Sequence, residues 1–152
     1  MREIKFRAFL KEKKKMLPVT YLTLSDEESE QVGVADCNNE GCVLCVDFYD
    51  YEKVELMQYT GLQDKNGKEI FEGDIESDEN GNLSVVCYLE KYGAYCFVPL
   101  VIYVHEDYEN QVRYSYGYDC YFDNAIPSKY ATVIGNIYEN PELLEELQNG
   151  TK

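Results

Sequence analysis

Hydrophobic and polar residues alternate over short runs along most of the chain, which is the pattern of half-buried β-strands. In residues 3–10, EIKFRAFL, Ile4, Phe6 and Ala8 fall on one face of an extended chain, while Lys5 and Arg7 fall on the other. Gly, Asn and Asp separate the runs, so the pattern predicts a mainly β protein, an antiparallel barrel or sandwich. Further strands are expected at residues 16–24, 43–50, 54–59, 83–90, 94–105, 112–122 and 130–138.

Prolines and polar stretches mark where these runs are interrupted. Pro18 near the start of its run indicates an edge strand or a first strand position, and Pro99 indicates a bulge or two separate strands. Residues 25–41 contain SDEESE and NNEG. We interpret this stretch as a surface loop, with room for a helical turn capped by Ser25.

One helix is predicted, at the end of the chain in ENPELLEELQNG. Asn140 is a good N-cap, Pro141 suits the first helical position, and Gly150 can end the helix in the left-handed conformation. So short a helix is marginal by itself, so its apolar residues should dock on the sheet. These residues are Leu143, Leu144 and Leu147.

The stretch TGLQDKNGKEIFEGDI, residues 60–75, is rich in turn residues. Asp64 to Gly67 suit a type I turn with Gly67 at positive φ, and Asn66-Gly67 alternatively suit a type I′ turn. Gly73 and Asp74 form a second turn. The carboxylates here could form an acid–base or metal site, but in a chain with 29 acids hairpin geometry is the better explanation; they are Asp64, Glu69, Glu72 and Asp74.

QYTGLQDKNGKEIFEGDI, residues 58–75, resembles the signature of the YopX protein family, small proteins encoded by phages and prophages of Gram-positive bacteria. Residues 2–19 are similar to the opening of the family, where a Trp often replaces Phe9, and residues 133–144 are similar to its closing strand and helix. The residue pattern predicts N-terminal β-strands and an acidic loop over residues 1–59, which form one compact unit with the rest. The resemblance implies an SH3-like barrel with the C-terminal helix over residues 60–152. It implies no activity, because the family is functionally uncharacterised.

Charge narrows the classes of partner. The chain holds 14 Lys and Arg against 29 Asp and Glu, a net charge of −15. The first 15 residues carry seven bases and two acids, so the remainder carries −20. Such a field repels phosphate backbones, so direct nucleic-acid binding is not expected. The short basic run at residues 11–15 is interpreted as a solvated turn.

No apolar stretch approaches the length of a membrane span, and the first residues lack the pattern of a secretory signal. We therefore expect no membrane association and a cytoplasmic location, in the bacterial cell that carries the phage or prophage. The six cysteines are then expected as reduced thiols.

Three cysteines have the spacing of a metal or iron–sulfur loop. Cys37, Cys42 and Cys45 form C-x4-C-x2-C, and Cys87 or Cys96 could supply a fourth ligand. Against this, residues 43–48 have the composition of a buried strand, acidic surroundings should raise thiol pKa values, and the family motifs lie elsewhere. The prediction is therefore no metal, cofactor or catalytic residue.

Two other features of the sequence could support chemistry, a lone histidine and a run of tyrosines. His105, the sole histidine, lies at an expected strand end before an acidic turn, without a nucleophile context. Tyr114, Tyr116 and Tyr118 would share one strand face and could stack bases, but only Arg113 supplies a nearby cation. An aromatic core or a protein-contact face is the preferred interpretation. Phosphate-loop, dinucleotide and zinc-helix motifs are absent from the sequence.

Three functions follow as hypotheses. The first is a non-enzymatic protein-binding module acting on a host or phage partner, with any activity expected within residues 76–130. The second is an acidic mimic of nucleic acid that inhibits a host DNA- or RNA-binding protein. The third is a metal-binding protein or enzyme built on Cys37, Cys42 and Cys45 or on His105. A homo-oligomer is compatible with the tyrosine-rich run and a sheet edge.

Overall fold

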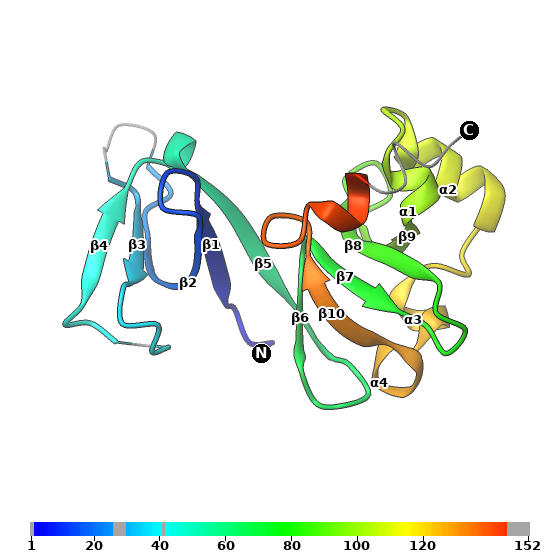
Figure 1. The fold of residues 1–152 in the computed structure, drawn as a ribbon, viewed down its shortest axis with the longest axis horizontal. Helices are drawn as coiled ribbons and strands as arrows, with labels where there is room; N and C mark the ends of the chain where they lie inside the picture. Colours follow the sequence, from blue (N-terminus) through cyan, green and yellow to red (C-terminus); the bar gives the residue numbers. More distant parts are fainter. Residues whose placement is uncertain (1, 26–29, 41, 146–152) are drawn as a thin grey trace. The chain divides into compact units, whose positions relative to one another are not determined.

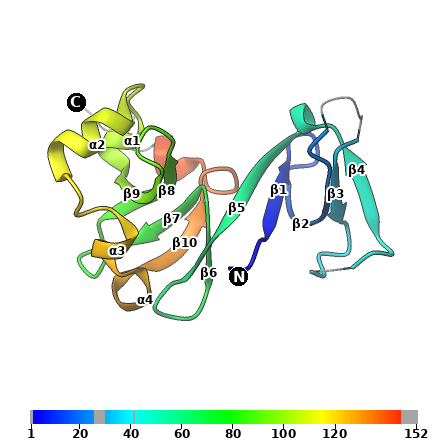
Figure 2. The same cartoon turned by 180° about the vertical axis from the view of Figure 1, so that it is seen from behind.

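The computed structural model describes residues 2–25, 30–40 and 42–145. The chain divides into two compact units, Met1–Tyr59 (unit 1) and Thr60–Lys152 (unit 2). Both are drawn in Figures 1 and 2. Within the described ranges, no helix combines the length and the apolar character needed to cross a membrane.

The first antiparallel sheet has the order β4-β3-β2-β1-β5-β6. Unit 1 contains β4, β3, β2, β1 and the first part of β5, and each of these strands lies beside the next (Figure 1). Ala8 faces Leu17 on one side and Leu56 on the other, so the apolar positions of three strands share one core. The elements are β1 Phe6–Leu10, β2 Lys15–Leu22, β3 Val32–Ala35, β4 Val46–Tyr49, the 3-10 turn η1 Tyr51–Lys53 and β5 Val54–Gln63.

The prediction of a loop over residues 25–41 is wrong for residues 32–35, which form the fully buried strand β3. A Cβ built on Gly33 would lie 2.9 Å from both the Tyr21 Cβ and the Val46 Cγ1. Side chains of both neighbouring strands therefore close over Gly33. Gly and the shortness of the run made the strand hard to recognise, since Gly is depleted in strands.

Unit 2 holds a second antiparallel sheet in the order β10-β7-β8-β9. Val85 and Cys87 of β8 face one apolar cluster, while Val86 between them faces another, so both faces of this sheet are covered. The elements are β6 Glu69–Phe71, β7 Asp74–Ser77, β8 Leu83–Leu89, β9 Ala94–Pro99, α1 Leu100–Tyr103, α2 Tyr108–Tyr116, α3 Phe122–Ala125, α4 Pro127–Tyr130 and β10 Thr132–Asn136.

The hairpin predicted at Asp64–Gly67 is present in its type I form. The Gly67 N–H donates to the Asp64 carbonyl at 3.0 Å, and Gly67 has a φ of 81°. The Asp64 carboxylate accepts N–H bonds from Asn66 and Lys68, and its second oxygen accepts the Val133 N–H at 2.9 Å. It therefore ties the hairpin to β10 as well as closing the turn.

The second turn is also confirmed. Gly73 has a φ of 81°, and the Asp74 carboxylate accepts the Phe71 N–H at 2.8 Å. Glu69 and Glu72 are half-buried on β6 and directly after it. Asp64 and Asp74 thus hold the backbone, as hairpin geometry predicted.

Two of the predicted strands are helical over part of their length. The run at residues 94–105 is strand only as far as Pro99 and then forms α1, and the run at 112–122 includes the end of α2. In α2, Tyr108 and Val112 lie one helical turn apart and contact the core, whereas Tyr114 is 94% exposed. The alternation of tyrosines suggested a strand face, but burial of Tyr108 and Val112 favours the helix.

The mainly β class is confirmed as two antiparallel sheets, but the strand pairings of the described residues close no barrel, so an SH3-like barrel is not supported. At the C-terminus, residues 142–145 are helical, and Leu143 and Leu144 contact the core of unit 2. Leu147 and Gly150 lie outside the described residues. The Asn140 side-chain oxygen accepts the Asn136 N–H at 3.1 Å, so it bonds back toward β10.

Candidate metal centre

The loop that joins β3 to β4 carries three cysteines. Ala35 and Val46 are paired at the base of this loop, and the Asp36 N–H donates to the Cys45 carbonyl at 2.9 Å. Asn38 takes a φ of 59° and donates its N–H to the Ala35 carbonyl at 2.9 Å. Asn tolerates the left-handed region better than most residues, so the chain can reverse directly after Cys37.

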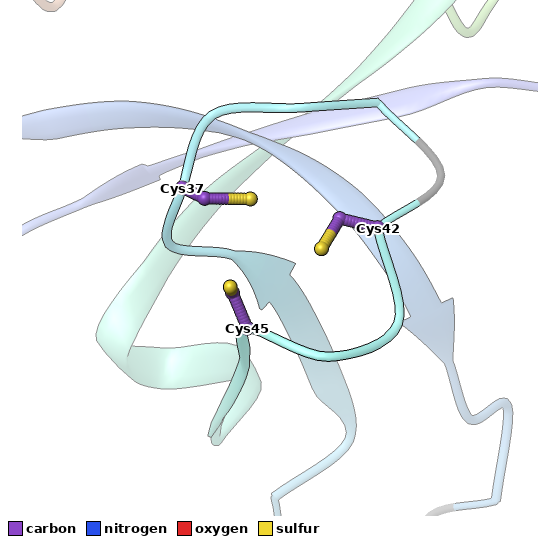
Figure 3. A group of neighbouring side chains, drawn as sticks. All are labelled: Cys37, Cys42 and Cys45. Carbon is purple, nitrogen blue, oxygen red and sulfur yellow. The ribbon is translucent and has the colours of Figure 1, made fainter.

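This reversal brings the three thiols together. The sulfur atoms of Cys37, Cys42 and Cys45 all lie within 4.8 Å of one another. Figure 3 shows the side chains converging from three sides of the loop. Cys37 and Cys45 are exposed and Cys42 is half-buried, so a metal ion could reach all three from solvent.

Hydrogen bonds make the Cys42 thiol more acidic than the Cys45 thiol. Donation from the Leu44 N–H, then from the Cys37 thiol and the Cys45 N–H, lowers the pKa of Cys42 to about 7. The neighbouring thiols Cys37 and Cys42 raise the pKa of Cys45 to about 11. At neutral pH Cys42 is therefore readily available as a thiolate, and a bound cation is needed to ionise Cys45.

The donor set fits a soft, tetrahedral metal ion. A Zn–S bond of about 2.3 Å places tetrahedral sulfur ligands roughly 3.8 Å apart, so at most about 1 Å of closure is required of this loop. Thiolates select zinc and copper(I) over hard cations such as Mg²⁺. Among the described residues the cluster has three thiols, which leaves a fourth tetrahedral position for another ligand.

The two proposed fourth ligands do not serve that role. Cys87 and Cys96 face each other across β8 and β9 and are buried in the apolar core of unit 2. Burial raises the pKa of the Cys87 thiol well above its ordinary value. Both behave as small core hydrophobes, as free cysteine commonly does.

One of the three sequence arguments against a metal site is wrong, and a second one fails for Cys42. Residues 43–45 are an exposed loop rather than a buried strand, with Val43 at 77% and Leu44 at 92% exposure. The pKa of Cys42 is lowered rather than raised, whereas the pKa of Cys45 is raised, by the neighbouring thiols rather than by acidic residues. The strand interpretation failed because β4 begins only at Val46, so the apolar pair belongs to the loop.

The other candidates of the sequence do not assemble into a site. His105 is exposed, one residue after the C-cap of α1. Tyr114 and Tyr116 lie on α2 and Tyr118 lies beyond it, so the proposed strand face for base stacking does not exist. Arg113 instead donates to the Tyr118 and Tyr121 hydroxyls within unit 2.

One residue that the sequence reasoning missed is Glu76, a buried carboxyl on β7. Strand alternation around Ile75 would place it on a solvent face. The sheet is covered on both faces, so this position is buried as well. The sequence around Glu76 holds no signal of this burial, because the residues that cover the second face of the sheet come from segments distant in the chain.

Comparison with known proteins agrees with the signature at residues 58–75. The crystal structure of protein EF1440 from Enterococcus faecalis is similar, with a TM-score of 0.56 and 27% sequence identity over 95% of this chain and 99% of that one. Among curated proteins, none matches the chain. The model of the YopX protein family matches residues 5–145, nearly the whole length, and the chain therefore belongs to the YopX family.

Proposed function

We propose that this protein is a zinc-dependent binding module whose unit 1 holds Zn²⁺ through Cys37, Cys42 and Cys45. The observation that carries the proposal is the convergence of three accessible sulfur atoms within 4.8 Å on one loop. A thiol pKa of about 7 at Cys42 supports it, because the first ligand is available as thiolate at neutral pH.

The fourth zinc position is the point at which a partner would bind. Zinc with three protein ligands keeps an open position that water or an outside donor fills. Val43 and Leu44, both largely exposed, flank Cys42 and offer an apolar surface beside that position. A protein partner that supplies a His, Cys or carboxylate donor and an apolar side chain would complete the site, which is the non-enzymatic binding role expected from the sequence.

Cobalt substitution tests the metal site directly. Reduced, metal-free protein titrated with Co²⁺ should develop thiolate charge-transfer and tetrahedral d–d bands that saturate at one equivalent, and Zn²⁺ should bleach them. Cys37→Ser, Cys42→Ser and Cys45→Ser should each weaken zinc binding by roughly a hundredfold or more.

The matched control is Cys120→Ser, which changes a half-buried thiol in unit 2 and should leave zinc affinity unchanged. A Co²⁺ complex without thiolate bands would refute the proposal. So would unchanged zinc affinity in the three loop variants.

The alternative of a nucleic-acid mimic is favoured by an uneven distribution of charge. Unit 2 holds 17 acids against six bases, whereas unit 1 holds 12 against eight. If unit 2 occupies the basic groove of a host protein, complex formation should weaken steeply between low and physiological salt. Binding that does not respond to salt would argue against mimicry. A phage or prophage origin remains the setting expected from the family resemblance.

A further inference from the structure

Unit 2 contains a cleft of about 780 Å³ that is separate from the cysteine loop and that the proposed function does not use. The β7–β8 hairpin forms one wall, and the end of β9 with the start of α1 forms another. The volume lies within the range of roughly 300–1,000 Å³ that is typical of small-molecule sites.

The wall of the cleft is acidic and apolar together. Glu76, Asp78 and Asp119 are among its residues, and the described wall residues include no Lys, Arg or His. Apolar and aromatic surface comes from Leu83, Phe97, Leu100, Tyr116 and Tyr130. An apolar lining with a few placed polar groups is the usual composition of a ligand pocket.

Glu76 is the polar group of this wall that burial affects most. Glu76 is 5% exposed. In the sheet it is paired with Ser84 of β8 on one side and with Val133 of β10 on the other. Burial, reinforced by the nearby Asp78 carboxylate, raises the pKa of Glu76 to about 7, while a hydrogen bond with the Ser84 side chain partly offsets this.

Asp78, the other acid of this hairpin in the cleft wall, has a structural role. Asp78 accepts N–H bonds from Asn80 and Asn82 and closes the β7–β8 turn. Asp64, outside the cleft, accepts three backbone N–H groups. The Glu76 carboxyl has a hydrogen bond with the Ser84 hydroxyl, whereas the carboxylates of Asp64 and Asp78 accept several backbone N–H groups. A cation beside it would relieve the cost of burying its charge.

The negative net charge of unit 2 also favours a cationic ligand. Unit 2 carries a net −11 of the total −15, so its field concentrates cations at long range. An organic amine with an apolar or aromatic body matches both parts of the wall, the ammonium at the carboxyl and the body against the rings.

We propose that this cleft binds a small organic amine, with the ammonium group held by the Glu76 carboxylate and the hydrocarbon body held by Leu83, Phe97 and the neighbouring tyrosines. The ligand is a free small molecule rather than a macromolecule. The cleft lies within unit 2, whereas the cysteine loop lies in unit 1, so a test of this proposal does not depend on whether zinc binds.

Tryptamine is the test compound, and tryptophol and indoleacetate are its neutral and anionic counterparts of nearly equal size. Amide chemical shifts of the full-length protein report binding residue by residue. Tryptamine should give saturable shifts at the cleft and bind at least about tenfold more tightly than tryptophol at pH 8, with indoleacetate weakest.

Two variants separate a defined site from bulk charge. Glu76→Gln should abolish the preference for tryptamine over tryptophol, whereas Glu79→Gln removes an exposed acid of the same hairpin and should leave it unchanged. Equal binding of the amine and the alcohol to the wild type, absence of saturable shifts, or equal loss in both variants would overturn the proposal.

A pH series on the wild type avoids any dependence on how the variants fold. The groups that share the cleft with Glu76 are Asp78, Asp119, Cys120, Tyr116 and Tyr130. Of these groups, Asp78 has a lowered pKa. Burial opposes its ionisation, but hydrogen bonds from the Asn82 side chain and from backbone N–H groups stabilise the carboxylate more strongly. It therefore stays ionised over the range tested. Tryptamine affinity should rise about tenfold from pH 6 to pH 8 as Glu76 ionises. A flat profile would contradict binding at this carboxyl.

Discussion

At the scale of single residues, the environment of a side chain decides its chemistry more than its neighbours in the sequence do. The three loop cysteines are alike in the sequence, yet Cys42 has a pKa of about 7 and Cys45 about 11. Local backbone N–H donors stabilise one thiolate, and this thiolate in turn opposes ionisation of the next thiol. Acidic composition alone pointed in the wrong direction for Cys42.

This difference predicts the order of alkylation in metal-free protein. Cys42 should react with iodoacetamide faster than Cys45 at pH 7, because the thiolate is the nucleophile, and its rate should follow a midpoint of about 7. Peptide mass spectrometry of a labelling time course measures both rates. Cys87, buried in unit 2, is the unreactive control. Equal rates at Cys42 and Cys45 would refute the assignment, and bound Zn²⁺ should protect both.

Glu76 predicts a defined dependence of stability on pH. Its folded-state pKa, about 7, lies above its ordinary value of 4.5, so the folded state binds the proton more tightly. The contribution of Glu76 is therefore full below pH 4.5 and is lost as the pH rises to about 7. The loss should approach about 3 kcal/mol.

Glu76→Gln removes this titration. The free energy of unfolding of the variant relative to the wild type should increase between pH 5 and pH 8, and urea unfolding at several pH values measures it. Glu79→Gln, exposed in the same hairpin, should show no such trend. A difference that is constant with pH would contradict the buried, protonated carboxyl.

At the scale of elements, two hairpins are closed by the same kind of turn. Residues 64–67 are DKNG and residues 78–81 are DENG. In each, the Asp carbonyl accepts the Gly N–H at 3.0 or 3.1 Å, and its carboxylate accepts the N–H groups two and four residues later. Gly67 and Gly81 have φ values of 81° and 82°. The same four-residue pattern therefore specifies the same turn twice.

The two aspartates differ in their long-range contacts, and this difference predicts unequal effects of mutation. Asp64 is 4% exposed and also accepts the Val133 N–H of β10, whereas Asp78 bonds only near its own turn in the contacts described. Asp64→Ala should destabilise unit 2 by roughly 3 kcal/mol or more, and Asp78→Ala by about 1 kcal/mol. Urea unfolding gives both values. Equal losses would show that the bond to β10 contributes little.

How much of each element could be predicted depended on whether local or distant contacts specify it. The 64–67 hairpin was predictable because Asp and Gly carry its geometry themselves. β3 and α2 were not, because Gly33 is buried only by side chains from neighbouring strands, and Val112 selects a helix only because a core lies beneath it. The thiol cluster was visible as spacing, but its convergence depends on the reversal at Asn38.

At the scale of the whole molecule, the two units carry different chemistry. Unit 1 has its own core and the thiol loop, while unit 2 has two apolar clusters, the acidic cleft and most of the negative charge. A ligand that binds a folded unit stabilises it by mass action, and the gain reaches about 2.7 kcal/mol when the free ligand exceeds its dissociation constant a hundredfold. Bound zinc should therefore stabilise unit 1 against unfolding.

Hydrogen exchange followed by mass spectrometry can locate this stabilisation. Saturating Zn²⁺ should slow exchange in peptides from β3 and β4, which the loop joins, and leave β8 and β9 of unit 2 unchanged. Cys42→Ser should lose the effect in β3 and β4. Protection that appears in unit 2 alone, or that persists in Cys42→Ser, would place the metal away from this loop. The pattern expected here distinguishes a built site from zinc scavenged by carboxylates, because unit 2 holds most of the acids.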